Sequence, residues 1–230
     1  MTVVSGLTLS QNQDKFYMKN LLIIGARGFG REIFSLAQEC HGYNVDWNIK
    51  GYLDDKKDAL DMFGDLPPII DSVENYQIMP DDIFVCALGD VRQKFKYVNI
   101  IKEKGGEFLS LIHTTAIIFR DTTFDEGLIL FPYTVISCNV TLGKFVTILP
   151  FSVLGHDVVL GNFCHLNSYS FMGGFVKAGD FVTVNTGATI VPEMKIGEHA
   201  VIGAGSVIIQ NVPADSTVFG NPARIIKQLK

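Results

Sequence analysis

A hydrophobic residue recurs at every sixth position through the second half of the chain, and this period constrains the fold more than any other feature. Small or medium residues such as Val146, Ser152 and Cys164 follow four places later, which gives a second inward row. Three such steps make one coil of 18 residues, and stacked coils share a continuous core. The sixteen apolar positions are Ile118, Phe124, Leu130, Ile136, Leu142, Ile148, Leu154, Leu160, Leu166, Met172, Ala178, Val184, Ile190, Ile196, Ile202 and Ile208.

Glycine or asparagine often follows the apolar position directly, and both residues tolerate a positive φ. We therefore expect a corner after each short strand. A regular helix would not accept glycine in most hexads, and one long strand would not keep its side chains in phase over ninety residues. The residues concerned are Gly143, Gly155, Gly161, Gly173, Gly179, Gly197, Gly203, Asn167 and Asn185.

The first half of the chain has a different pattern, in which short apolar runs alternate with helical segments. It predicts a small, open, parallel α/β sheet of the Rossmann-like type. We expect an N-terminal extension over 1–17, the α/β domain over 18–112 and the coiled repeat with a C-terminal cap over 113–230. The expected strands are Leu21–Ile24, Ile49–Leu53, Ile83–Leu88 and Phe108–Ile112, and the expected second helix is Val91–Lys104.

A glycine-rich loop, residues 25–30, joins the first strand to the first helix. Such a loop lets backbone N–H groups at a helix N-terminus approach a phosphate. Its spacing is GxxGxG, not the dinucleotide GxGxxG, so a plain tight turn stays an alternative. Ligands of open α/β sheets bind beyond the carboxyl ends of the strands. The candidate binding residues there are Arg27, Gly28, Phe29, Asp54, Asp55 and Gly89.

Charge and composition exclude several classes of function. The formal net charge of -5 disfavours nucleic acid as a partner. No run reaches the roughly 18 apolar residues of a membrane span, and the first residues do not resemble a secretory signal, so we expect a cytoplasmic protein. The four cysteines form no CxxC pair, which predicts reduced thiols and no metal site.

The repeat resembles that of the hexapeptide-repeat acyltransferases, and the chain from Met18 onward resembles the NeuD and PglD type of bacterial sugar acyltransferases. The resemblance rests on the domain order, on Leu53-Asp54-Asp55 and on the segment from Gly155 to His165. It implies a left-handed parallel β-helix, a homotrimer, acetyl-CoA as acyl donor and a nucleotide-linked amino sugar as acceptor. The family's glycine loop is often GASGHG, so Arg27 and Phe29 are departures.

The same resemblance implies roles for individual residues. His156 is the expected general base, since a neutral imidazole suits proton transfer near neutral pH. Asp157 is expected to orient it. His156 and His165 lie half a coil apart, so we expect one site to draw them from two chains of a trimer. The expected acetyl-CoA contacts are His165, Gly174, one coil beyond His156, and the small residues Thr186 and Ala204 of another edge.

The predicted function is therefore transfer of an acetyl group from acetyl-CoA to the amino group of a nucleotide-linked sugar, by direct attack. An acyl-cysteine at Cys164 is a rival mechanism, although this residue falls in the inward row. O-acetylation of a sialic-acid-like or other sugar is the nearest alternative. A non-catalytic, nucleotide-binding trimeric scaffold is an alternative of another class. A dinucleotide oxidoreductase is a third, but no hydride-acceptor domain is recognisable.

Overall fold

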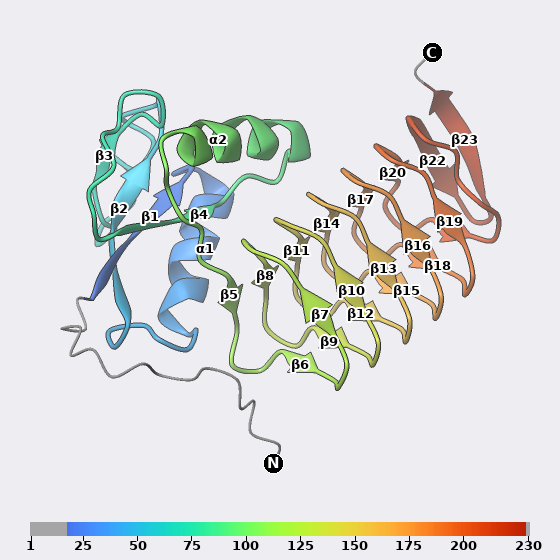
Figure 1. Ribbon diagram of the computed structural model, residues 1–230. Helices are drawn as coiled ribbons and strands as arrows, with labels where there is room; N and C mark the ends of the chain where they lie inside the picture. Colours follow the sequence, from blue (N-terminus) through green and yellow to red (C-terminus); the bar gives the residue numbers. More distant parts are fainter. Residues whose placement is uncertain (1–17, 229–230) are drawn as a thin grey trace.

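The computed structural model describes residues 18–228, which form a parallel sheet with two helices followed by a three-sided stack of short strands (Figure 1). The extension predicted over 1–17 lies outside the described residues. None of the helices between residues 18 and 228 has the length and apolar character needed to cross a lipid bilayer.

The N-terminal sheet has four parallel strands in the order β3-β2-β1-β4. Alternate residues of β1 point to opposite faces: Leu21 and Ile23 pack in the cluster that includes α1, and Leu22 and Ile24 in the cluster that includes α2. Each face of the sheet is thus covered by one helix. The elements are β1 (Lys19–Ile24), α1 (Gly28–Gln38), β2 (Trp47–Leu53), β3 (Ile69–Asp71), β4 (Asp82–Cys86) and α2 (Val91–Glu103).

The strand expected over Phe108–Ile112 is wrong as a member of this sheet. Phe108 makes only an isolated bridge to Phe84, whereas β5 (Leu111–Ile112) pairs with the second half of the molecule. The fourth strand of the N-terminal sheet is instead β3, a three-residue segment without a distinct apolar pattern. The division of the chain at residue 112 therefore stays a prediction.

Beyond the N-terminal sheet, strands stack in three parallel sheets, here called the β5, β6 and β7 sheets after their first strands. The β5 sheet has β5, β8 (Ile129–Leu130), β11 (Thr147–Ile148), β14 (His165–Leu166), β17 (Thr183–Val184), β20 (Val201–Ile202), β22 (Ser216–Gly220) and the antiparallel β23 (Ala223–Gln228). The β6 sheet has β6 (Ile117–Ile118), β9 (Val135–Ile136), β12 (Val153–Leu154), β15 (Phe171–Met172), β18 (Thr189–Ile190) and β21 (Val207–Ile208). The β7 sheet has β7 (Thr123–Phe124), β10 (Thr141–Leu142), β13 (Val159–Leu160), β16 (Lys177–Ala178) and β19 (Lys195–Ile196).

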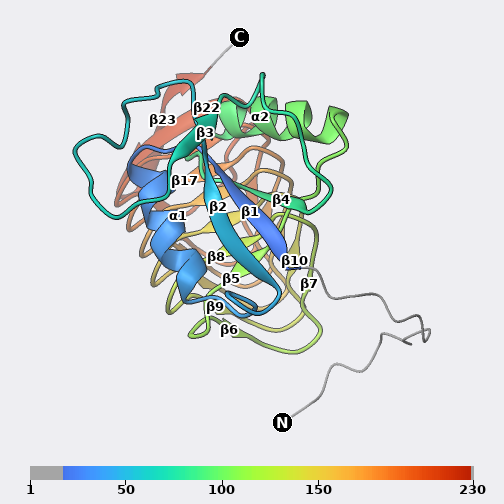
Figure 2. The ribbon, with the colours of Figure 1, turned by 90° about the vertical axis from the view of Figure 1, so that its left-hand side faces the viewer.

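The register of these sheets confirms the predicted coil. Thr141 of β10 pairs with Val159 of β13, 18 residues later, and the same offset recurs in the other two sheets. The second residue of most strands points inward, and these residues with Val146, Cys164 and their equivalents form one continuous buried cluster. This half is the left-handed parallel β-helix that the resemblance implied. Viewed along its length, the β-helix lies behind the N-terminal sheet (Figure 2).

The corner glycines have a different role from the one expected. The positive φ angles fall two residues later, at Phe145, Asp157 and Phe163 among others. A Cβ atom on Gly155 would lie 2.7 Å from the backbone nitrogen of Gly174 in the next coil. Glycine is therefore required there because successive coils approach closely, and not because of its φ angle.

Aromatic side chains occupy many of the positive-φ positions and stack on one another between coils. Phe145, Phe163 and Phe181 form such a column, with ring centroids 5.0 and 5.3 Å apart. Phe95 of α2 packs edge-on against this column at Phe163 and Phe181. The N-terminal domain is thus held against the β-helix by aromatic packing.

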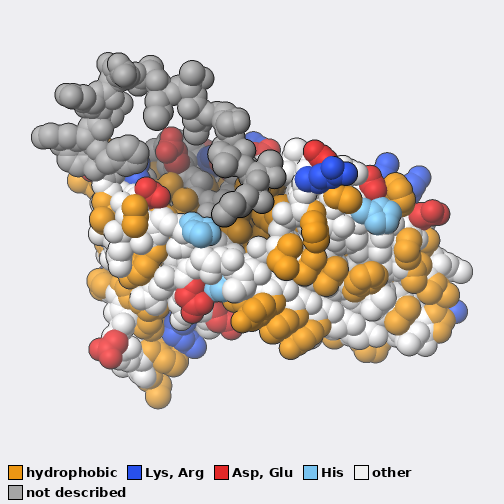
Figure 3. Space-filling view, turned by 90° about the horizontal axis from the view of Figure 1, so that it is seen from below, with side chains coloured by type: hydrophobic (Ala, Val, Ile, Leu, Met, Phe, Trp, Pro, Cys, Tyr) orange, Lys and Arg blue, Asp and Glu red, His pale blue; other side chains and the backbone are white. Residues whose placement is uncertain are grey.

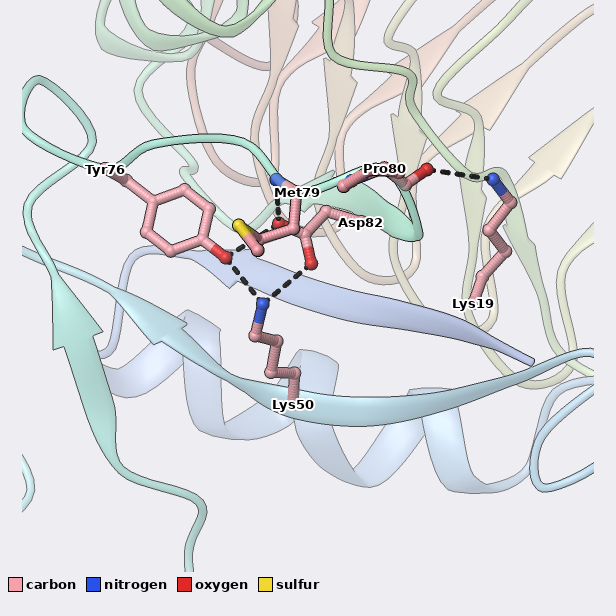
Figure 4. Close-up of polar contacts among 6 residues, drawn as sticks. All are labelled: Lys19, Lys50, Tyr76, Met79, Pro80 and Asp82. Carbon is pink, nitrogen blue, oxygen red and sulfur yellow. Dashed lines mark hydrogen bonds and ion pairs between the residues drawn. The ribbon is translucent and has the colours of Figure 1, made fainter. Parts of the chain in front are cut away.

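A polar cluster at the opposite end of the N-terminal sheet from the glycine loop holds the segment before β4 (Figure 4). Lys50 of β2 donates to Asp82 at 2.8 Å and contacts the Tyr76 hydroxyl at 2.7 Å. Tyr76 also donates to Asp82, at 2.7 Å. Burial opposes ionisation of Asp82, but the hydrogen bonds from Lys50, Tyr76 and the Met79 backbone outweigh it, so its pKa is lowered. This cluster is structural.

Candidate functional site

A cavity of about 400 Å³ opens at the carboxyl ends of β1, β2 and β4, where ligands of open α/β sheets bind. Of the six residues expected there, five line it: Arg27, Phe29, Asp54, Asp55 and Gly89. Gly28 instead lines a second hollow, on the side of α1 that faces Pro132 and Pro150 of the β-helix. The two hollows therefore lie on either side of the glycine loop.

The glycine loop has its shape for local reasons. Gly25 has a φ of +95°, and a Cβ atom on Gly30 would lie 2.0 Å from the Gly25 carbonyl oxygen. At Gly28 nothing lies within 4 Å of such an atom, so packing among the described residues does not require glycine there. Helix α1 begins at Gly28 with Arg27 at its N-cap, without a side-chain cap from the described part of the chain. Its first backbone N–H groups therefore remain available to an anion.

The two aspartates after β2 have different surroundings. Asp54 accepts hydrogen bonds from the backbone nitrogens of Ala26 at 2.8 Å and Lys56 at 2.9 Å, so its carboxylate fastens the glycine loop to the end of β2. Asp55 is exposed, and the Tyr97 hydroxyl of α2 donates to it at 3.3 Å. Asp55 is thus the carboxylate that can accept a hydrogen bond from a ligand in the cavity.

Two polar side chains that line the cavity were not expected from the sequence. Gln93 and Tyr97 lie in the first turns of α2 and line the cavity opposite the glycine loop. Asp90 caps this helix by accepting from the backbone nitrogens of Arg92 and Gln93. Asp90 is a favoured N-cap residue and directly follows Gly89, so the sequence could have indicated that α2 begins at the cavity and brings Gln93 and Tyr97 to it.

His156 lies at the corner between the β6 and β7 sheets, in a pair with the next residue. Its Nδ1 atom is 2.8 Å from Oδ2 of Asp157, and the imidazole side chain is 53% exposed. Asp157 reaches back because its φ is +59°. With Nδ1 held by the carboxylate, Nε2 is free to accept a proton from a nucleophile.

Gly174 lies one coil beyond His156, as expected, and the imidazole fills the space above it. A Cβ atom on Gly174 would lie 2.7 Å from Cε1 and 2.8 Å from Nε2 of His156. Phe175, which the sequence analysis did not single out, packs edge-on against the imidazole with ring centroids 5.0 Å apart. Gly174 and Phe175 together fix the direction of the His156 ring.

His165 lies elsewhere, in β14 of the β5 sheet, where the N-terminal domain covers it. The residue is 4% exposed and its ring packs edge-on against Phe29 at 5.8 Å. Burial, and next the charge of Lys94, lower the pKa of His165 to about 3. Thr186 and Ala204 lie at a third place, the corner between the β5 and β6 sheets, one coil apart.

The cysteines do not support a covalent acyl-enzyme. Cys164 is completely buried in the β-helix core, and burial raises the pKa of its thiol to about 12. A thiol of this kind is not a nucleophile near neutral pH. The described residues, 18–228, contain no group of three or more His, Cys, Asp or Glu side chains that could hold a metal ion.

Comparison with known proteins gives a family for the first domain and a fold for the whole chain. Residues 20–101 match the family described as PglD N-terminal domain. No curated protein sequence matches the chain.

Three solved structures share the architecture. WeeI from Acinetobacter baumannii AYE has a TM-score of 0.80 and 26% identity, over 91% of this chain and 100% of its own. PerB from Caulobacter crescentus, in complex with CoA and GDP-perosamine, has a TM-score of 0.82 and 22% identity, over 92% and 99%. The acetyltransferase domain of PglB from Neisseria gonorrhoeae FA1090, in complex with acetyl coenzyme A, has a TM-score of 0.82 and 24% identity, over 91% and 100%. Residues 20–101 thus carry the PglD N-terminal domain, and the whole chain shares the fold of these structures, which supports the resemblance to the NeuD and PglD type of sugar acyltransferases seen in its sequence.

Proposed function

We propose that this chain is an acetyl-CoA-dependent N-acetyltransferase that acts on the amino group of a nucleotide-linked sugar. The observation that carries the proposal is the pairing of an exposed, carboxylate-bound imidazole, His156, with a separate cavity at the carboxyl ends of the N-terminal strands. The relatives support the choice of substrates, since PerB is bound to CoA and GDP-perosamine and the PglB domain to acetyl coenzyme A.

The cavity suits the nucleotide part of the acceptor. The uncapped start of α1 and the Arg27 guanidinium favour a diphosphate, while Asp55 and Gln93 offer hydrogen-bonding groups to a base or ribose. The sugar then extends past Gly28 toward the hollow beside Pro132 and Pro150. Because nucleotide-linked sugars and acetyl-CoA are cytoplasmic compounds, we propose that the protein acts in the cytoplasm.

The reaction itself needs one proton acceptor and no covalent enzyme intermediate. Nε2 of His156 takes a proton from the sugar amine as the nitrogen attacks the thioester carbonyl carbon. The C–S bond then breaks, and CoA leaves as the thiolate or, after protonation, the thiol. Asp157 stabilises the imidazolium that forms.

His156 and the cavity of one chain lie on opposite sides of the β-helix. The N-terminal domain covers the β5 sheet, and His156 sits at the corner between the other two sheets. A sugar bound in this cavity therefore cannot reach His156 of its own chain. The site must combine the cavity of one copy with His156 of another, and we propose a homotrimer for this reason.

The β6 sheet supplies the surface for that trimer. Its outward side chains are apolar over several coils, among them Ile117, Val135, Val153 and Phe171, of which Ile117 is 50% and Phe171 41% exposed. Hydrophobic side chains also gather along the β-helix in the space-filling view (Figure 3). An exposed apolar sheet face of this kind is typical of a protein interface.

If three copies turn this face toward a common axis, the His156 corner of each copy meets the Thr186 and Ala204 corner of the next. The pantetheine arm of acetyl-CoA then lies between two chains, along that corner. Gly187 and Gly205 leave it open, because nothing in the described part of the chain lies within 4 Å of a Cβ atom at either position. Each interface then joins two different surfaces of the chain, and three such interfaces around one axis close a ring of three copies.

The test is release of free thiol from acetyl-CoA with a panel of UDP-, GDP- and dTDP-linked amino sugars. His156→Ala serves as the inactive variant, and the acetylated product is identified by mass spectrometry. We expect release with at least one amino sugar and an amide product. If no acceptor releases thiol, the scaffold alternative is favoured. If only hydroxyl acceptors react, the protein is an O-acetyltransferase.

A further inference from the structure

An exposed column of aromatic side chains runs along the corner between the β5 and β6 sheets. Tyr133, Phe151 and Tyr169 follow one another at the interval of one coil, and their rings stack with centroids 5.2 and 5.1 Å apart. Tyr133 is 56% and Tyr169 62% exposed. The aromatic column on another corner, which includes Phe163, is covered by Phe95 of α2, whereas this one is open to solvent.

The exposed column ends at Tyr169. The next two positions in register are Gly187 and Gly205, which leave the corner open. Tyr169 therefore stacks on Phe151 with one face of its ring and has no aromatic neighbour on the other face among the described residues. Between Tyr169 and Gly187, the corner thus changes from a filled edge to an open one.

The level of this change along the β-helix matches that of the proposed base. Successive coils lie about 4.8 Å apart and the chain climbs from one to the next, so the order in sequence gives the level of each corner residue. Tyr169 comes between His156 and Gly174, and the imidazole of His156 fills the space between those two residues. Copies related by an axis parallel to the β-helix hold equivalent residues at one level. Nε2 of His156 in one copy therefore lies level with the Tyr169 ring of the next copy.

The lower part of the exposed column lies on the side of the acceptor. Pro132 and Pro150 directly precede Tyr133 and Phe151, and both prolines line the second hollow, toward which the sugar extends. The donor approaches from the opposite direction, along the open edge beyond Tyr169. The two substrates therefore meet beside the last ring of the column.

We propose that Tyr169 is a specificity-determining residue that limits the transferred acyl group to acetyl. This inference rests on the proposed function, because it requires the site between two copies. The pantetheine arm passes Ala204 and Thr186, and its thioester stops at the level of His156 of the neighbouring copy. There the ring of Tyr169 closes the open edge. The methyl group of an acetyl thioester fits against this ring, whereas every further methylene group of a longer acyl chain has to displace it.

Competition between acyl donors tests this role. The full chain is given an equimolar mixture of acetyl-, propionyl- and butyryl-CoA with the amino sugar that releases thiol in the acceptor screen, and mass spectrometry gives the ratio of the amide products. This ratio equals the ratio of the kcat/KM values for the donors, so incomplete folding or assembly of a variant does not change it. We expect wild type to prefer acetyl over butyryl by at least about 100-fold, and Tyr169→Gly to reduce this preference at least about tenfold.

Three further variants separate the ring of Tyr169 from other effects. Tyr169→Asn also suits the φ of +61° and should reduce the preference for acetyl, although less than Tyr169→Gly. Tyr169→Phe keeps the ring without its hydroxyl group and should keep the wild-type product ratio. Tyr133→Gly is the matched control, because Tyr133 is an exposed residue of the same column with a φ of +59° but lies two coils away. Its product ratio should equal that of wild type.

Two results would overturn the inference while the proposed function stands. One is acetyl transfer by Tyr169→Gly and Tyr169→Asn with the wild-type product ratio, which would mean that the ring does not border the acyl group. The other is an equal change of the ratio in Tyr133→Gly, which would assign the effect to the column as a whole. If wild type transfers no acyl group to any acceptor, the proposed function fails and the inference fails with it, so the two failures are distinguishable.

Discussion

The β5 and β6 sheets of the β-helix are built from the same two-residue strands, yet their outward surfaces differ. The β5 sheet presents Thr147 and His165 to the N-terminal domain, and both are buried there. The β6 sheet presents Val153 and Phe171 to solvent. Their inward residues belong to one common core. The repeat thus specifies the interior, while function depends on what covers each outward face.

The largest expected effect comes from the exposed corner at the edge of the β6 sheet. His156→Ala removes the proposed base at the exposed corner, and we expect kcat to fall by about 10³, within the range of general-base catalysis. KM for acetyl-CoA should change little. Thiol release at saturating substrates measures the effect, with His199→Asn as the control in the same β-helix, because asparagine tolerates the φ of +58° at this position. Retention of more than about a tenth of the wild-type kcat would remove His156 from its proposed role.

The proposed role of the exposed β6 sheet as an interface between copies can be tested by placing a charge on it. Phe171→Lys puts an ammonium group into the proposed interface between copies, and we expect monomers with at least about 100-fold lower activity, because a buried unpaired charge is unfavourable. Analytical ultracentrifugation gives the oligomeric state. Val159→Lys, at the outward position of β13 in the β7 sheet, is the control and should leave the assembly intact. A fully active Phe171→Lys monomer would contradict the two-chain site.

The covered β5 sheet differs from the β6 sheet because a buried charge, the ammonium group of Lys94 from α2, lies against it. Lys94→Met with Thr147→Val replaces the ammonium and its partner by apolar groups. We expect the free energy of unfolding to rise by about 3 kcal/mol at pH 7, because the folded-state pKa of Lys94 is lowered from 10.5 to about 8 and one pKa unit corresponds to about 1.4 kcal/mol. Urea unfolding measures this.

The difference in unfolding free energy between the double variant and wild type should also depend on pH. Folded wild type loses the Lys94 proton above about pH 8, whereas the unfolded chain keeps it to about pH 10.5, so wild type gains stability relative to the variant in this window. The advantage of the double variant should therefore shrink between pH 7 and pH 9.5. The buried thiols titrate in both proteins and cancel in the difference. A constant difference across this range would show that the charge is not its cause.

The smallest expected effect concerns Asp157. Asp157→Asn keeps the φ of +59° and a group that can accept from Nδ1 of His156, but it removes the negative charge. We expect kcat to fall about tenfold, because the imidazolium that forms when His156 takes the proton is less stabilised without the carboxylate. Thiol release at saturating substrates measures this, and a kcat equal to that of wild type would mean that the carboxylate does not act on His156.

Most of the β-helix was predictable because its period repeats. Of the sixteen apolar positions expected inward, all from Leu130 to Ile208 are buried, whereas Phe124, in the first coil, is 44% exposed. The reason for the corner glycines was not predictable, since close approach between Gly155 and Gly174 depends on how two coils stack. In the N-terminal domain, β3 was missed and Phe108–Ile112 was placed in the wrong sheet, because three-residue strands carry no periodic signal.

The candidate site was predictable as a set of residues but not as an arrangement. The loop at Gly28, the aspartates after β2 and the pair His156-Asp157 follow from local sequence, since each depends on neighbours within a few positions. The sequence does not determine which side chains the two domains bring together. That Lys94 lies beneath His165, and that His156 faces away from the cavity of its own chain, result from contacts between segments far apart in sequence.

By itself, then, the amino-acid sequence determined the three-sided column, because a side chain at every sixth position has only one interior to fill. Only the tertiary structure decided which of its outward faces is buried against the N-terminal domain and which is left open. Outward side chains have no partner within their own coil, so their burial and charge depend on whatever packs against them.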